Sequence, residues 1–161
     1  METRFLRRMS IFGGVQAGIL DHLFELARRV TVVEGEFFFQ EGSRGTSAFV
    51  LEDGRVSILK NSDGRNQLLR HLETGDCFGE VALLDFGPRS ASVLADVDCR
   101  AIELSAGNLL EISKIDLEQF ALIYMNIARE LSRRLRAADD RLFAASLEGS
   151  AFATDYAFST T

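Results

Sequence analysis

Apolar and polar residues alternate along much of the chain between residues 30 and 104, and turn residues recur there every eight to twelve positions. Alternation with a period of two is typical of β-strands that are buried on one face. The pattern predicts eight strands, at residues 30–33, 36–40, 47–52, 55–60, 67–73, 76–78, 91–95 and 99–104. Asp53-Gly54, between two apolar runs, is the clearest hairpin turn. Short strands at this spacing favour an all-β roll or sandwich.

A helical period replaces the alternation on both sides of these strands. Before them, Ile19, Leu23 and Leu26 follow one another at helical spacing and predict an amphipathic helix over residues 15–29. A short helical turn is expected over residues 5–12.

Two more helices are expected after the strands. Ser105 suits the N-cap of a short helix that ends near residue 113, and Asp116 starts a longer one, with Gln119 completing a start that resembles a capping box. The longer helix carries a narrow apolar stripe of the coiled-coil kind, formed by Tyr124, Ile127, Leu131, Leu135, Ala138 and Leu142. The stripe predicts a homodimer through this carboxy-terminal helix. The alternative is that it packs on the protein's own strands.

The length of 161 residues is enough for one domain with a substantial core. We divide the chain into an amino-terminal segment at 1–14, a domain at 15–145 that includes the long helix, and a tail at 146–161. The tail is small and polar, and we expect it to be poorly ordered.

Charge and composition exclude several classes of function. The net charge of −6 disfavours general binding to nucleic acid, and we expect no DNA partner. No apolar run approaches the ~20 residues of a membrane span, and the amino terminus lacks the apolar segment of a signal peptide. Cys77 and Cys99 lie in predicted strands, where small buried side chains are expected rather than a disulfide or a metal site. These features together indicate a cytoplasmic protein.

The chemically informative stretch lies between the sixth and seventh predicted strands, at residues 78–93. Gly79 lets the backbone approach a ligand, and the short helical turn after it offers free N–H groups to an anion. Arg89, nine positions after Glu80, adds a charged fork that suits a phosphate. Glu80 can accept hydrogen bonds from sugar hydroxyls. Each residue alone also fits an ordinary turn or a solvated charge, but together they fit a ribose cyclic phosphate.

This stretch resembles the phosphate-binding cassette of the cyclic-nucleotide-binding domain family, with the pattern F-G-E-x-A-L-L, a loop, and then R-S-A-x-V. Gly35, Phe39, Glu41-Gly42 and the Asp53-Gly54 hairpin match the first half of the family's β-roll. The resemblance runs from about residue 11 to about residue 143. It implies a mainly β fold with flanking helices (α+β). Its centre is an eight-stranded antiparallel β-roll with a short cassette helix, an amino-terminal helix and a long carboxy-terminal helix.

The resemblance also implies a role for each residue of the cassette. Arg89 would clamp the exocyclic phosphate oxygens, and Glu80 with the Gly79 backbone would hold the ribose 2′-hydroxyl. The N–H groups of the turn and of the residues after the arginine would complete the phosphate site. The ligand-binding residues are therefore expected to be Phe78, Gly79, Glu80, Val81, Ala82, Leu83, Arg89, Ser90 and Ala91, together with Arg134 on the long helix.

Arg134 is included because it breaks the apolar pattern of the long helix. By analogy with the family, the residues that cover the purine lie near Arg133 and Arg134, and a guanidinium there could stack on the base. The alternative is a solvated charge paired with Glu130 four residues earlier.

The leading hypothesis is a sensor that binds cAMP, or less favourably cGMP, and signals to an effector protein of unknown identity through its carboxy-terminal helix. Ser90 is compatible with either nucleotide. The alternative is a β-roll that serves protein interaction or oligomerisation and no longer binds nucleotide, which the presence of both Glu80 and Arg89 disfavours. An enzyme acting on the cyclic nucleotide is not expected, because no metal cluster or general base accompanies the cassette and both His22 and His71 fall outside it.

Overall fold

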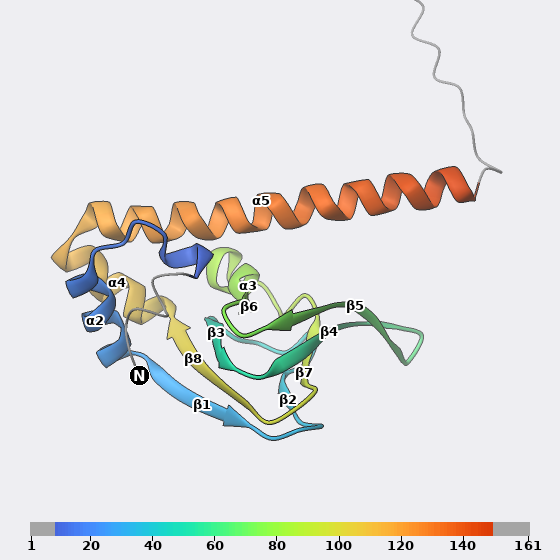
Figure 1. Ribbon diagram of the computed structural model, residues 1–161, viewed down its shortest axis with the longest axis horizontal. Coiled ribbons are helices and arrows are strands. Elements are labelled where there is room, and N and C mark those ends of the chain that lie inside the picture. Colours follow the sequence, from blue (N-terminus) through green and yellow to red (C-terminus); the bar gives the residue numbers. More distant parts are fainter. Residues whose placement is uncertain (1–8, 150–161) are drawn as a thin grey trace, which may run out of the picture. The chain divides into compact units, whose positions relative to one another are not determined.

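The computed structural model describes residues 9–149 (Figure 1). Most of the predicted tail and the first part of the turn predicted at residues 5–12 lie outside this range. The elements are η1 (Ser10–Phe12), α2 (Ala17–Leu26), β1 (Arg28–Val32), β2 (Phe37–Phe39), β3 (Ser47–Asp53), β4 (Arg55–Ser62), β5 (Arg65–Glu73), β6 (Cys77–Phe78), α3 (Glu80–Asp85), β7 (Ser92–Ala95), β8 (Cys99–Ser105), α4 (Ala106–Ile115) and α5 (Leu117–Glu148).

All eight predicted strands are present, and they pair antiparallel in two four-stranded sheets. One sheet has the order β1-β8-β3-β6 and the other β2-β7-β4-β5. The fold is therefore the expected antiparallel roll with a cassette helix and flanking helices.

The main core lies between the inner faces of the two sheets. Alternate residues of the strands supply it, as the period-two pattern predicts. Its buried members are Val32, Phe49, Leu51, Val56, Ile58, Leu72, Phe78, Val93, Ala95, Cys99 and Ala101. Cys77 and Cys99 are both buried, as expected for small apolar side chains.

A second apolar layer joins the helices to the first sheet. Val50 of β3 and Ile102 of β8 lie opposite each other and are buried, although they alternate with the residues of the main core. The helices contribute Leu20, Leu109 and Ile123, which are also buried, and α4 packs against both α2 and β8 (Figure 1). The first sheet is thus covered on one face by the second sheet and, around Val50 and Ile102, on the other face by helices.

Two parts of the chain form separate compact units, of which the first ends at Ile127 and the second begins at Ala128. The boundary falls within α5, and we describe each unit by itself. In the first unit, the Asn126 amide donates to the carbonyls of Ile11 (3.2 Å) and Gly13 (2.9 Å) and ties the amino-terminal segment to the start of α5.

The predicted helix boundaries need two corrections. The helix expected over residues 15–29 ends at Leu26, because β1 begins at Arg28 and pairs with β8. The capping box is at α4, where Ser105 and Asn108 exchange hydrogen bonds. At α5 the Asp116 carboxylate accepts from the Gln119 N–H (3.0 Å), but the Gln119 side chain accepts from the Gln16 N–H (2.7 Å). A long-range partner has replaced the local one.

The Ser105→Ala substitution should lower the free energy of unfolding by about 1 kcal/mol, because it removes the side chain that caps α4. Ser113→Ala on the same helix is the matched control. Its hydroxyl donates only to the Leu110 carbonyl three residues earlier, and its loss should change the stability by less than about 0.5 kcal/mol. Urea denaturation measures both values, and equal effects would show that the cap contributes nothing.

Candidate functional site

The cassette is built around Arg89, whose side chain is only 5 % exposed. Its Nη1 donates to the carbonyl of Ser47 (2.6 Å) and to that of Gly79 (3.0 Å). The Cζ atom lies 4.0 Å from the centroid of the Phe39 ring, a distance typical of a cation–π contact. The guanidinium is thus held by the Ser47 carbonyl of β3, the Phe39 ring of β2 and the Gly79 carbonyl before α3.

The opposite edge of the guanidinium is poorly satisfied. Nε of Arg89 is buried and has no hydrogen-bond partner within the described residues. Nη2 has one long contact, 3.4 Å to the hydroxyl of Ser47. No carboxylate of the described residues lies within ion-pairing distance of this arginine. A buried cation without an anion is costly, so this edge is suited to an anionic ligand.

The Glu103 carboxylate is linked to Arg89 indirectly, through the Ser47 hydroxyl. The Ser47 hydroxyl donates to Oε1 of Glu103 (2.7 Å), and Oε2 of Glu103 accepts from Nη2 of Arg28 (2.5 Å). Burial lowers the pKa of the Arg89 guanidinium, while the negative charges of Glu103 and Glu80 raise it. An arginine nevertheless keeps its proton in proteins, so the site presents a permanent positive charge.

Two positions beside the Arg89 guanidinium, Gly45 and Gly79, have no room for a side chain. A Cβ atom at Gly45 would lie 2.5 Å from Nη2 and 2.6 Å from Nε, in front of the unsatisfied edge. Gly79 has a φ of +78°, and a Cβ there would lie 2.8 Å from Nη1. The first glycine keeps the edge open, and the second allows the turn from β6 into α3 in a backbone conformation that other residues adopt only with strain.

The short helix α3 follows Gly79, whose carbonyl accepts from this arginine, and its first residue, Glu80, acts on the arginine through its charge. The helix begins at Glu80, so the N–H groups of its first turn have no partner within the helix. The Glu80 side chain is buried. After Asp85 the chain turns, with the Asp85 carboxylate accepting from the Gly87 N–H at 2.8 Å. The loop then returns to Arg89 and runs into β7.

Most of the predicted site residues come together. Gly79 and Arg89 are in direct contact, Glu80 acts on Arg89 through its charge, and Ser90 and Ala91 follow in the same strand connection. The Phe78 side chain is buried and stacks on Phe49 (ring centroids 5.5 Å apart), so its ring packs beneath the site.

Arg134 belongs to the separate unit that starts at Ala128, and its place relative to the cassette stays a prediction. Within that unit its Nε lies 3.2 Å from Oε1 of Glu130, the pair that the alternative interpretation names.

Sequence analysis missed Gly45, Ser47 and Glu103 as parts of the site. The run of small polar residues before β3, together with a glycine outside any turn motif, was the only indication of Gly45 and Ser47. Nothing local indicates Glu103, which acts through β8 across the sheet.

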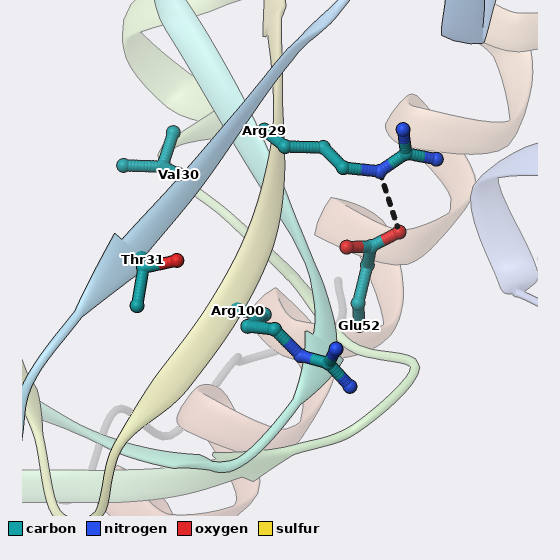
Figure 2. A pocket seen from close by; sticks show the side chains of 5 residues that line it. All are labelled: Arg29, Val30, Thr31, Glu52 and Arg100. Carbon is teal, nitrogen blue, oxygen red and sulfur yellow. Dashed lines mark hydrogen bonds and ion pairs between the residues drawn. The ribbon is translucent and has the colours of Figure 1, made fainter. Parts of the chain in front are cut away.

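A hollow of about 310 Å³ lies on the first sheet, away from the cassette, and is lined by Arg29, Val30, Thr31, Glu52 and Arg100 (Figure 2). Figure 2 shows Arg29 facing Glu52, with Nε 3.5 Å from Oε1. Arg100 in turn lies 3.4 Å from the Asp53 carboxylate. Both arginines therefore have carboxylate partners, and this hollow lacks the unsatisfied cation that distinguishes the cassette.

The model of the family described as the cyclic nucleotide-binding domain matches residues 29–116 of the chain. The chain belongs to this family. A CRP-like cAMP-activated global transcriptional regulator of Mycobacterium tuberculosis is 30 % identical over 138 residues, which are 85 % of this chain and 60 % of the regulator. A cGMP-dependent protein kinase of Toxoplasma gondii is 39 % identical over 106 residues, which are 64 % of this chain and 10 % of the kinase.

A solved structure shows the same fold. The catabolite activator protein of Thermus thermophilus superposes with a TM-score of 0.76 at 30 % identity, over 86 % of this chain and 64 % of that one. The chain thus spans about three fifths of the regulators and a tenth of the kinase. Within residues 9–149, no helix is long and apolar enough to cross a membrane, and no cluster of three potential metal ligands occurs.

The Gly45→Ala substitution should displace the Arg89 guanidinium, because the new methyl group would lie within 2.6 Å of both Nη2 and Nε. The end of a long side chain can move, and φ at Gly45 is not in the left-handed region, so the fold should persist. NMR measures the displacement, because the Phe39 ring shifts the resonances of the Arg89 side chain that stacks on it. In Gly45→Ala, the shift that the Phe39 ring causes in these resonances should be largely lost.

Gly18→Ala in α2 is the matched control, because nothing lies within 4 Å of the new methyl group. It should leave the Arg89 resonances unchanged and raise the stability by roughly 0.5–1 kcal/mol. Arg89 resonances that are the same in both variants would show that Gly45 does not keep the edge of the guanidinium open.

Proposed function

We propose that this chain is a sensor module that binds a cyclic nucleotide, cAMP in preference to cGMP, and transmits binding through its carboxy-terminal helix. The proposal places it in the cytoplasm, assigns it no catalytic step and leaves its effector protein unnamed. The family membership supports the ligand class.

The buried and unsatisfied edge of Arg89 carries this proposal. Nε and Nη2 lie side by side on one edge of the guanidinium, and such an edge binds two oxygens of one phosphate. Nη1 is already engaged by Ser47 and Gly79, so the arginine is held in place before the ligand arrives. Its position needs no ordering on binding, which favours affinity.

The rest of the cassette supports a cyclic nucleotide rather than a free phosphate. The N–H groups of Val81, Ala82 and Leu83 in the first turn of α3, and those of Ser90 and Ala91, would surround the remaining phosphate oxygens. The Glu80 carboxylate would repel a second anion but accepts hydrogen bonds from neutral hydroxyls. One anion site beside one hydroxyl site fits a ribose with a cyclic phosphate.

The choice between the two nucleotides depends on the relatives. The regulator of M. tuberculosis is named for activation by cAMP, and it matches 85 % of this chain. The kinase of T. gondii is named for dependence on cGMP and matches a smaller share, 64 %. We therefore favour cAMP.

The response is proposed to pass through α5. Leu135 and Leu142 of the predicted stripe are exposed in a single chain, as a seam between two chains requires, whereas Ile127 of the same stripe is buried in the first unit. The homodimer stays a prediction, and so does the covering of the purine by Arg134.

Arg89→Ala should weaken the binding of cAMP by about 2–5 kcal/mol, some tens to thousands of fold in Kd, because it removes a buried charge that faces the ligand. Glu80→Ala should cost less, since it removes hydrogen bonds to neutral hydroxyls. Titration calorimetry with cAMP and cGMP measures both variants and the choice of nucleotide.

Arg100→Ala is the matched control, because this arginine lies in β8, outside the cassette, and has a carboxylate partner in Asp53. Its affinity for cAMP should equal that of the parent. Parental affinity in the Arg89 and Glu80 variants as well would contradict the cassette assignment. If the parent binds neither nucleotide, the module without a nucleotide becomes the better hypothesis.

Arg134→Ala should speed the release of cAMP severalfold while the contacts of the cassette persist, if its guanidinium covers the purine. Stopped-flow displacement of a fluorescent cAMP analogue measures the dissociation rate. Arg141→Ala is the control, because Arg141 lies farther along the same helix, donates to the Ala137 carbonyl (3.1 Å) and is not assigned to the base. An unchanged dissociation rate for Arg134→Ala would show that Arg134 forms only an ion pair on the helix surface.

A further inference from the structure

Lys60 reaches from β4 to the strand connection that follows Arg89. Its ammonium group donates to the Ser90 carbonyl at 2.6 Å and lies 2.7 Å from Oε1 of Glu41. The side chain is 49 % exposed. An exposed ion pair contributes little to stability, so a role of Lys60 must be sought in what its ammonium group holds.

Hydrogen bonds at their carbonyl oxygens fix two successive peptide groups of this connection. The Arg89 carbonyl accepts from the Gly42 N–H at 2.8 Å, and the Ser90 carbonyl accepts from Lys60. A trans peptide group is planar, with its C=O and N–H pointing in opposite directions. The first bond therefore turns the Ser90 N–H away from Gly42, and the second turns the Ala91 N–H away from Lys60.

Glu41 holds Lys60 in this position and links it to the rest of the frame. Its second carboxylate oxygen, Oε2, accepts from the Asn61 N–H at 2.8 Å, and its own N–H donates to the Ser92 hydroxyl at 2.8 Å. The hydrogen bonds from Lys60 and Asn61 lower the pKa of the Glu41 carboxyl, so it is ionised at neutral pH. Glu41 thus joins the turn after β2 to β4 through its carboxylate and to β7 through its backbone N–H.

We propose that Lys60 is a positioning residue for ligand binding: with Glu41, it orients the Ala91 N–H toward the phosphate without touching the ligand itself. This inference rests on the proposed function of the cassette. It means that a surface lysine raises the affinity for the ligand although it does not contact the ligand. The competing explanation is that Lys60 attracts the anionic ligand through its charge alone.

The two explanations predict opposite effects for Glu41→Gln. If Lys60 acts through its charge, removing the neighbouring negative charge should tighten the binding of cAMP. If Lys60 acts by position, Glu41→Gln should weaken binding, because the ammonium group loses the carboxylate that holds it. Glutamine keeps a carbonyl oxygen that can still accept from Asn61, so the turn should remain folded.

The experiment measures the Kd of cAMP for the full chain carrying Lys60→Met, Glu41→Gln or both substitutions. We expect roughly a tenfold weakening for Lys60→Met, the order expected for one hydrogen bond to a charged group, and a smaller weakening for Glu41→Gln. The double variant should bind no more weakly than Lys60→Met, since both residues act through one hydrogen bond. The weakening should persist at high salt, where attraction between exposed charges is screened.

Lys114→Met is the matched control. Lys114 is the other lysine of the chain and is also paired with a glutamate, Glu111 at 2.6 Å, but on α4. Equal Kd values for the two lysine variants, or tighter binding by Glu41→Gln, would overturn the inference.

A second measurement needs no ligand and separates this inference from the proposed function. In the free protein, Lys60→Met should shift the Ala91 amide resonance, because the peptide group loses the hydrogen bond at the Ser90 carbonyl, whereas Lys114→Met should leave this resonance unchanged. An unmoved Ala91 amide would overturn the positioning role even if the parent binds cAMP. If the parent binds no nucleotide, the cassette assignment fails, and the amide data still decide whether Lys60 fixes the peptide group.

Discussion

The burial of the Arg89 guanidinium is the interaction on which the site depends. A cation that is 5 % exposed must be compensated, and the protein compensates only part of it. Two backbone carbonyls and the face of Phe39 hold one side, whereas Nε stays without an acceptor in the described part of the chain. The structure thus fixes a buried cation and leaves one edge of it poorly satisfied, and this is the edge that we propose an anion completes.

The sequence was sufficient to predict the fold, because the features that specify it are local. Period-two alternation located all eight strands to within a few residues, and glycine turns such as Asp53-Gly54 separated them. The cassette was found for the same reason, since Gly79, Glu80 and Arg89 lie within one short stretch. Local patterns failed where a distant partner competed, as at Gln119, whose side chain binds Gln16 instead of its own helix start.

The supports of the site could not be predicted, because they depend on register between distant strands. Ser47 and Glu103 come into contact only through the pairing of β3 with β8, which places Glu103 opposite Phe49, two residues from Ser47, and Glu103 looks like an ordinary strand-surface carboxylate in the sequence. Lys60 likewise looks like a solvated charge, although the pairing of β4 with β7 brings it to the Ser90 carbonyl. Sequence patterns therefore identify the groups that would touch a ligand more readily than the groups that hold them.

The location of the groups that hold the cassette limits where a response to the ligand can arise. Every described support of the cassette, from Gly42 and Lys60 to Ser47 and Glu103, belongs to the sheets or their turns, and tightly packed sheets have few alternative arrangements. A ligand shifts a conformational equilibrium only when it contacts the two states differently. A preformed cassette contacts the phosphate alike in both, so the difference must come from a separately moving element. The unit that begins at Ala128, within α5, is compact by itself, and we propose that it supplies this difference and that the signal leaves the domain there.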